Sequence, residues 1–139
     1  MTSTLQLRVA WDECDPEGMV HAVNYYRWMD QAIHALMLRA GYGHRAIYET
    51  FGAYVPAVEA AASSKAPITF DDLLTIEIDI PHWGTRSFRI EYKGYGKSGL
   101  VFEGMEARVW ATIEDGQARS AAIPDAFRRA VAAVIAAGE

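Results

Sequence analysis

The sequence predicts an α+β fold in which one antiparallel sheet packs around or against one long helix. Three observations indicate this class. A strand-like segment near the N-terminus comes first, a long helical stripe follows it, and several strand-like segments then succeed one another through short turns. Strands joined by short turns are antiparallel, and this order of elements is typical of α+β proteins. A chain of 139 residues suits one domain, so we expect residues 1–139 to form a single unit.

The first part of the chain contains the strand, a loop and the long helix. Apolar and polar residues alternate from Leu5 to Trp11, which predicts a half-buried strand. The acidic segment 12–19 contains Pro and Gly and predicts a loop. Residues 23–39 predict a helix, and Gly41 suits its end. The apolar face of this helix consists of Tyr25, Trp28, Met29, Ala32, Ile33, Leu36, Met37 and Ala40.

The remaining chain predicts a short helix over 44–51, further strands and a terminal helix. The expected strands cover 54–62, 73–83, 87–96, 100–113 and 117–123. The turns at 96–99 and 114–116 have the Gly-containing chemistry of β-hairpins. Pro124 suits the first turn of the terminal helix, which we expect to end near Ala137. A sheet covered by one helix keeps open edges, so we expect dimerisation through an edge strand.

Composition excludes several functional classes. With 51% hydrophobic residues the chain is too apolar for a disordered protein, and its net charge of −5 argues against a nucleic-acid partner. No uncharged apolar run approaches the ~20 residues of a membrane span. Cys14 is the only cysteine and no secretory signal is apparent, so we expect a cytoplasmic protein. The four histidines are scattered, so we expect no metal site.

Ionisable side chains are densest in segment 12–25, around the start of the long helix. The free N–H groups and the positive dipole end of a helix start can stabilise an oxyanion. A carboxylate beside them can attack a carbonyl carbon or deprotonate water. Asp15 is the candidate because Pro16 restricts its backbone. Spacing alone leaves a structural alternative open, in which Asp12 or Asp15 only caps the helix.

Two adjacent motifs resemble the signature of the hot-dog-fold acyl-CoA thioesterases. They read Asp15-Pro16-Glu17-Gly18-Met19-Val20 and Asn24-Tyr25-Tyr26-Arg27-Trp28-Met29-Asp30. They are most similar to the 4-hydroxybenzoyl-CoA thioesterase branch, which uses an aspartate, and weaker resemblance extends over 70–77 and 86–88. The resemblance implies a five-stranded antiparallel sheet curled around the long helix. It also implies a homodimer with sites at the subunit interface, commonly paired into a tetramer.

The resemblance also implies residue roles. Asp15 would be the catalytic carboxylate, Gly18 belongs to the same catalytic loop, and the backbone N–H of Ala22 would polarise the thioester carbonyl. Asp30 matches a position near the ring hydroxyl of an aromatic acyl group, and Arg86 matches a position that contacts the coenzyme A phosphates. Coenzyme A is part of the substrate, so no further cofactor is expected.

Three more residues are expected to contact substrate. His21 and Asn24 lie at the helix start, where they would line the pocket. Glu59 is an isolated charge in an apolar run, where an unpaired carboxylate is costly. It therefore either reaches the site across a dimer interface or faces solvent from its strand.

The acyl group stays open between aromatic and short aliphatic. Arg86 stands alone where the hydroxybenzoyl branch has a basic run, and Ala22 replaces an aromatic residue. The sequence thus predicts an acyl-CoA thioesterase that releases a small free acid and CoA. Two alternatives use the same fold: a hydratase or dehydratase, in which His21 and Glu59 would meet, and a non-catalytic acyl-CoA-binding dimer.

Overall fold

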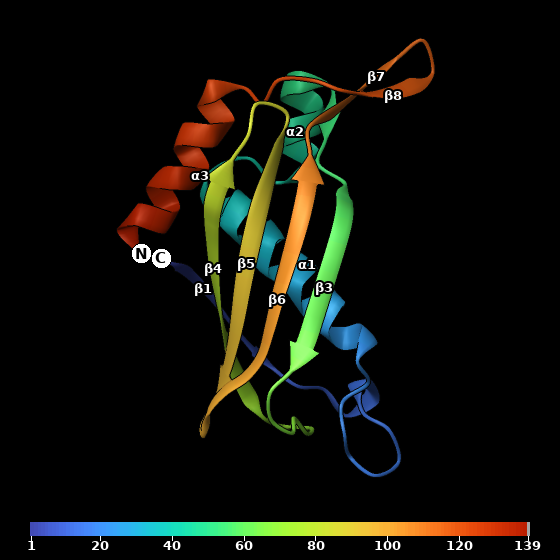
Figure 1. The fold of residues 1–139 in the computed structure, drawn as a ribbon, viewed down its shortest axis with the longest axis vertical. Coiled ribbons are helices and arrows are strands. Elements are labelled where there is room, and N and C mark those ends of the chain that lie inside the picture. Colours follow the sequence, from blue (N-terminus) through green and yellow to red (C-terminus); the bar gives the residue numbers. More distant parts are fainter. Residues whose placement is uncertain (139) are drawn as a thin grey trace.

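A computed structural model describes residues 1–138 and confirms the α+β class (Figure 1). Five strands form one antiparallel sheet in the order β1-β4-β5-β6-β3. They are β1 (Ser3–Arg8), β4 (Leu73–Trp83), β5 (Ser87–Gly96), β6 (Gly99–Val109) and β3 (Ala57–Ser64). A smaller sheet contains β2 (Ala53–Tyr54), β7 (Ala111–Glu114) and β8 (Gln117–Ser120). Together these strands provide the surface on which the helices pack.

The long helix α1 (Val23–Arg39) crosses one face of the large sheet, as predicted (Figure 1). The short helix α2 (His44–Phe51) follows it, and α3 (Asp125–Ala137) lies beside the β1 and β4 side of the sheet. The predicted apolar face of α1 is confirmed, because Trp28, Met29 and Ile33 are at most 1% exposed. The core therefore lies between α1 and the inward side chains of the sheet.

Two glycines let the sheet approach its neighbours closely. A Cβ at Gly104 of β6 would clash with the Sδ atom of Met29 on α1. A Cβ at Gly94 of β5 would clash with the ring of Phe102 on the adjacent strand. Glycine inside a strand often marks such a close approach. Gly104 thus allows the middle of α1 to pack directly on β6, and Gly94 makes room for the Phe102 ring.

The predicted first strand is wrong at its C-terminal end. The strand ends at Arg8, and Trp11 instead begins a 3-10 turn, with 67% of its surface exposed. The cause is Glu13, whose Oε1 accepts the Ala10 N–H at 2.7 Å and turns the chain away from the sheet. The Trp11 ring meets the Phe70 ring edge-on, with centroids 4.7 Å apart.

Two predicted long strands are each divided between the two sheets. The chain leaves β2 at Val55-Pro56, so Tyr54 pairs with β7 whereas Ala57 pairs with β6. Proline lacks the N–H that a continuous ladder requires. The second division falls at Trp110, whose N–H donates to the carbonyl of Arg86. Residues 54–58 and 109–111 are all apolar, so apart from Pro56 no change in the pattern marks either division.

Candidate active site

The loop before α1 is a tight hairpin with Asp15 at its turn. The Gly18 N–H donates to the Asp15 carbonyl at 2.9 Å, and the Asp15 N–H donates to the Met19 carbonyl at 2.8 Å. Pro16 suits the second position of such a turn, and Gly18 adopts φ +86°, which glycine tolerates best. The Asp-Pro-x-Gly motif is therefore explained first by local turn chemistry.

The hairpin holds one oxygen of the Asp15 carboxylate and leaves the other open. Oδ1 accepts the N–H of Glu17 at 2.9 Å and the N–H of Met19 at 3.0 Å. Among residues 1–138, no donor bonds to Oδ2, and Asp15 is partly exposed. The alternative in which Asp12 or Asp15 caps the helix is wrong, because no side chain caps the start of α1.

The start of α1 offers an N–H group without an acceptor. Ala22 is the N-cap residue of α1, with φ −56°. The preceding N–H, of His21, donates to the carbonyl of Glu13 at 2.9 Å, whereas the Ala22 N–H has no acceptor within the described residues. The first N–H groups of a helix lack intrahelical partners and can stabilise negative charge on an oxygen atom. Ala22 therefore has the geometry expected of an oxyanion donor.

Glu13 joins the hairpin to the helix, a role that the sequence analysis missed. Its buried carboxylate accepts the indole N–H of Trp28 at 2.9 Å, and its carbonyl accepts from Nδ2 of Asn24 at 3.0 Å. Oδ1 of Asn24 accepts from Arg27 at 3.1 Å. The signal that could have found Glu13 is Trp28, because a buried indole N–H needs an acceptor. Asn24 is thus engaged with protein, and its contact with substrate stays a prediction.

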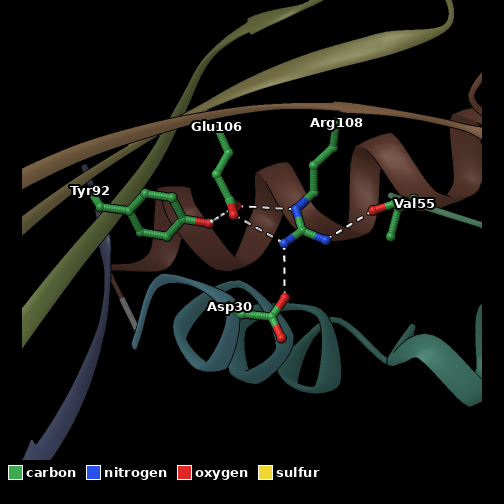
Figure 2. A network of polar contacts seen from close by, with 5 residues as sticks. All are labelled: Asp30, Val55, Tyr92, Glu106 and Arg108. Atoms are coloured by element: carbon green, nitrogen blue, oxygen red, sulfur yellow. Dashed lines mark hydrogen bonds and ion pairs between the residues drawn. The ribbon is translucent and has the colours of Figure 1, made fainter. Parts of the chain in front are cut away.

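Asp30 is held by a buried network (Figure 2). Its Oδ1 accepts from Nη2 of Arg108 at 2.9 Å. Arg108 also donates to both carboxylate oxygens of Glu106, at 3.1 and 3.2 Å, and to the Val55 carbonyl at 2.9 Å. The hydroxyl of Tyr92 donates to Glu106 at 2.6 Å. Figure 2 shows Asp30 reaching from α1 toward Arg108, with Glu106 and Tyr92 to the left of the guanidinium group and Val55 to its right.

Arg108 and Tyr92 both keep their protons in this network. Burial alone lowers the pKa of Arg108, but its hydrogen bonds and attraction to Glu106 raise that pKa above its ordinary value. Burial, together with Glu106, raises the pKa of Tyr92 well above its ordinary value, so the hydroxyl remains a donor. The resemblance pointed to Asp30, whereas its support by Arg108 was not predicted from the sequence. The sequence contained a signal for this support. Glu106 and Arg108 lie two residues apart, and therefore on one face, in a mainly apolar strand.

The other predicted substrate contacts lie elsewhere. Arg86 lies in the turn between β4 and β5, and its Nη1 donates to the carbonyl and the hydroxyl of Ser120, at 3.3 Å each. This turn and the loop before α1 lie at opposite ends of the long axis in Figure 1. Glu59 pairs with Ala107, which places its exposed side chain on the sheet face opposite Glu106 and Arg108. One chain alone therefore brings neither Arg86 nor Glu59 to Asp15.

Asp15, Gly18, His21 and Ala22 all lie in the hairpin or at the helix start that directly follows it. His21 is exposed there. The thiol of Cys14, in the same hairpin, donates weakly to the Ala10 carbonyl at 3.8 Å. Burial, and then the charges of Glu13 and Asp15, raise the pKa of Cys14. A protonated thiol is a poor nucleophile, so the structure does not favour Cys14 as the reactive group at this end of α1.

Within residues 1–138, no three or more His, Cys, Asp or Glu side chains are grouped so that they could hold a metal ion. In the same part of the chain, no helix has the length and apolar character needed to cross a membrane.

Comparison with known proteins agrees with this geometry. The profile of the thioesterase-like superfamily matches residues 9–131. The 4-hydroxybenzoyl-CoA thioesterase of Pseudomonas sp. strain CBS-3 is 30% identical over 128 residues, covering 87% of this chain and 91% of the relative.

Solved structures give the same result. The structure of a mutant 4-hydroxybenzoyl-CoA thioesterase complexed with 4-hydroxybenzoyl-CoA has a TM-score of 0.86 and 28% identity, covering 94% of this chain and 98% of the other. A gentisyl-coenzyme A thioesterase has a TM-score of 0.81 and 29% identity, covering 91% of this chain and 99% of the other. The chain therefore belongs to the thioesterase-like superfamily and is a thioester hydrolase with the hot-dog fold.

Proposed function

We propose that this protein hydrolyses a hydroxylated aromatic acyl-CoA to the free acid and CoA. The observation that carries the proposal is the open Oδ2 of Asp15, close in the chain to the unpaired N–H of Ala22. Asp30 supports the choice of acyl group, because its second oxygen is an exposed acceptor for a ring hydroxyl. Similar proteins are named for 4-hydroxybenzoyl-CoA and gentisyl-CoA, which both carry ring hydroxyls.

The chemistry follows from these groups. The thioester carbonyl oxygen would accept the Ala22 N–H at the positive end of α1, which stabilises the charge that develops on that oxygen. Oδ2 of Asp15 can act in two ways: it attacks the carbonyl carbon to form a mixed anhydride that water cleaves, or it deprotonates the attacking water. In both routes the CoA thiolate leaves readily, because a free thiol has a pKa near ~8.5.

The proposed site is shared between two copies. Ala22 and Asp30 are eight residues apart, which is about 12 Å along the axis of α1. In a two-fold dimer with antiparallel α1 helices, Asp30 of one copy would approach Ala22 of the other. Each acyl group would then contact both copies.

The sheet edge at β3 supports such a dimer. Strand β3 is an edge strand with small, exposed, mainly apolar side chains, whereas α3 lies beside the β1 edge. An unprotected edge strand readily pairs with another chain. We therefore propose a homodimer joined along β3, paired further into a tetramer. Arg86 of another copy could then supply the predicted contact with the CoA phosphates. A fully active monomer in light-scattering measurements would contradict this arrangement.

Release of free thiol from a panel of acyl-CoAs tests the function. The panel contains 4-hydroxybenzoyl, benzoyl, acetyl and hexanoyl thioesters, and we expect the highest kcat/KM for the hydroxylated ring. Asp15→Asn should lower kcat by about 10²–10⁴-fold, the usual contribution of a general base. The hairpin should persist because the Asn side-chain oxygen still accepts two N–H groups. Glu17→Gln, on the same turn, is the matched control and should retain activity.

Several outcomes would overturn the proposal. Near-normal hydrolysis by Asp15→Asn would remove the catalytic assignment, and faster hydrolysis of aliphatic thioesters would remove the aromatic one. Binding without thiol release would favour an acyl-CoA-binding dimer. Addition of water to the acyl chain without thiol release would favour a hydratase. We also propose that no metal or other cofactor takes part, so activity should survive EDTA, and that the protein is cytoplasmic.

A further inference from the structure

Arg108 is fixed in place by contacts other than Asp30. Three of its four hydrogen bonds go to Glu106 and to the Val55 carbonyl, and its side chain is only 6% exposed. Glu106 lies two residues earlier on the same face of β6, and the Tyr92 hydroxyl on β5 donates a further hydrogen bond to it. Most of the contacts that hold the guanidinium group therefore come from β6 and from the segment between β2 and β3, and only one comes from α1.

The charges show that Asp30 is not needed to bury Arg108. Arg108 and Glu106 already neutralise each other in the interior, with their side chains 6% and 5% exposed. Asp30 adds a second carboxylate whose side chain is 63% exposed. Only its Oδ1 is held by protein, and among residues 1–138 no donor bonds to Oδ2. The buried pair thus restrains a surface carboxylate while leaving one of its oxygens available.

We propose that Arg108, braced by Glu106, is a positioning residue that sets the preference for hydroxylated acyl groups by fixing the Asp30 carboxylate. This inference rests on the proposed function, since it concerns the same acyl site. An unrestrained aspartate on a helix surface samples several rotamers, and ordering it on substrate binding costs entropy. With Oδ1 already held by Arg108, Oδ2 is pre-oriented to accept the hydrogen bond of a ring hydroxyl.

The planar fork of arginine is essential to this role. Arg108 reaches Glu106, Asp30 and the Val55 carbonyl at the same time through three nitrogens. A lysine keeps the positive charge but presents a single nitrogen on a flexible stem, so it cannot hold Asp30 and Glu106 in the same geometry. Arg108→Lys therefore separates the charge of this residue from its positioning effect.

The test is the ratio of kcat/KM for 4-hydroxybenzoyl-CoA to kcat/KM for benzoyl-CoA. Asp30→Ala removes the acceptor, so the ratio of this variant defines complete loss of the preference for the hydroxylated ring. Arg108→Lys should lower the ratio by about tenfold or more, the usual effect of losing a hydrogen bond to a charged group. Its kcat/KM for benzoyl-CoA should stay near the wild-type value, because that substrate has no hydroxyl for Asp30 to recognise.

Tyr92→Phe is the matched control, because it tests whether the network acts only through the stability of the protein. It removes a buried hydrogen bond to Glu106 but leaves the Arg108–Asp30 contact intact. We expect a lower thermal midpoint and an unchanged ratio. If Arg108→Lys does not fold, Glu106→Gln takes its place, since it keeps Arg108 but removes the charge of its brace, and it should also lower the ratio.

The outcomes separate the inference from the proposed function. The inference would be overturned if Asp30→Ala lowers the ratio of the two kcat/KM values but Arg108→Lys leaves it at the wild-type value. Equal losses in Arg108→Lys and Tyr92→Phe would also overturn it, because the network would then act only through stability. A wild-type enzyme that hydrolyses both thioesters without preference overturns the inference but leaves thioester hydrolysis intact. If neither thioester releases thiol, the proposed function fails and the inference with it.

Discussion

The two aspartates of the site are held in different ways. Each has one carboxylate oxygen bound by protein and a second without a protein donor in the described chain. The Asp15 carboxylate is held by backbone N–H groups two and four residues ahead. The Asp30 carboxylate is held by a guanidinium group 78 residues away, which itself depends on a buried partner.

Holding the two carboxylates in place has different free-energy costs. The Asp15 hairpin uses backbone groups that any residue supplies, so its geometry depends mainly on Pro16 and Gly18. The support of Asp30 requires two charges to be removed from water, which is costly unless they remain paired. The first region should therefore tolerate changes at its carboxylate, whereas the second should be sensitive to loss of either buried partner.

Removal of the buried brace should have the largest effect on stability. Glu106→Leu leaves the Arg108 guanidinium without its main partner in the interior, so the free energy of unfolding should fall by about 3–5 kcal/mol. Urea unfolding measures the change. Asp15→Asn is the comparison on the hairpin side and should unfold near the wild-type urea concentration. Similar losses in the two variants would remove the distinction between the regions.

Removal of the helix-start donor should have the next largest effect, on catalysis. Ala22→Pro deletes the proposed oxyanion donor and should lower kcat by about 10²–10³-fold. The φ of −56° at Ala22 suits proline and its N–H has no protein acceptor, so stability should change little. Thiol release and thermal unfolding are the two measurements.

Ala22→Gly is the matched control for this substitution. Glycine keeps the backbone N–H and is tolerated at the N-cap of a helix. We expect the Ala22→Gly variant to retain most activity. Equal activities of the proline and glycine variants would show that the Ala22 N–H does not contribute to catalysis.

His44, which interacts electrostatically with Arg108 and Asp30, should make the free energy of unfolding slightly dependent on pH. Burial, then His34 and Arg108, lower the pKa of His44 below 6.5. The unfolded chain therefore binds more protons than the folded one as the pH falls below 6.5. The free energy of unfolding should decrease from that pH down to the lowered folded pKa and then level off. Urea unfolding of His44→Gln should lack this component, and an identical pH profile would contradict the prediction.

Local features of the site were predictable from the sequence. The loop before the long helix, the buried stripe of α1 and the placement of Ala22 at the helix start are all confirmed. Each depends on residues within a few positions of one another, where spacing and turn chemistry determine the conformation. The early end of the first strand, before Trp11, also has a local cause, which is the Glu13 carboxylate. The loop contains several carboxylates, and the sequence did not show which of them would turn the chain.

The sequence by itself determined the α+β class, the long helix and a carboxylate beside its start, because these follow from periodicity and short-range hydrogen bonding. Only the tertiary structure decided that Glu13 binds Trp28, that Arg108 binds Asp30, and that Glu59 lies on the opposite face of the sheet. These arrangements depend on strand register and on which buried charges find partners. A shift of one residue in register reverses the face of every side chain, and no local pattern specifies the partner of a charge that is distant in the chain.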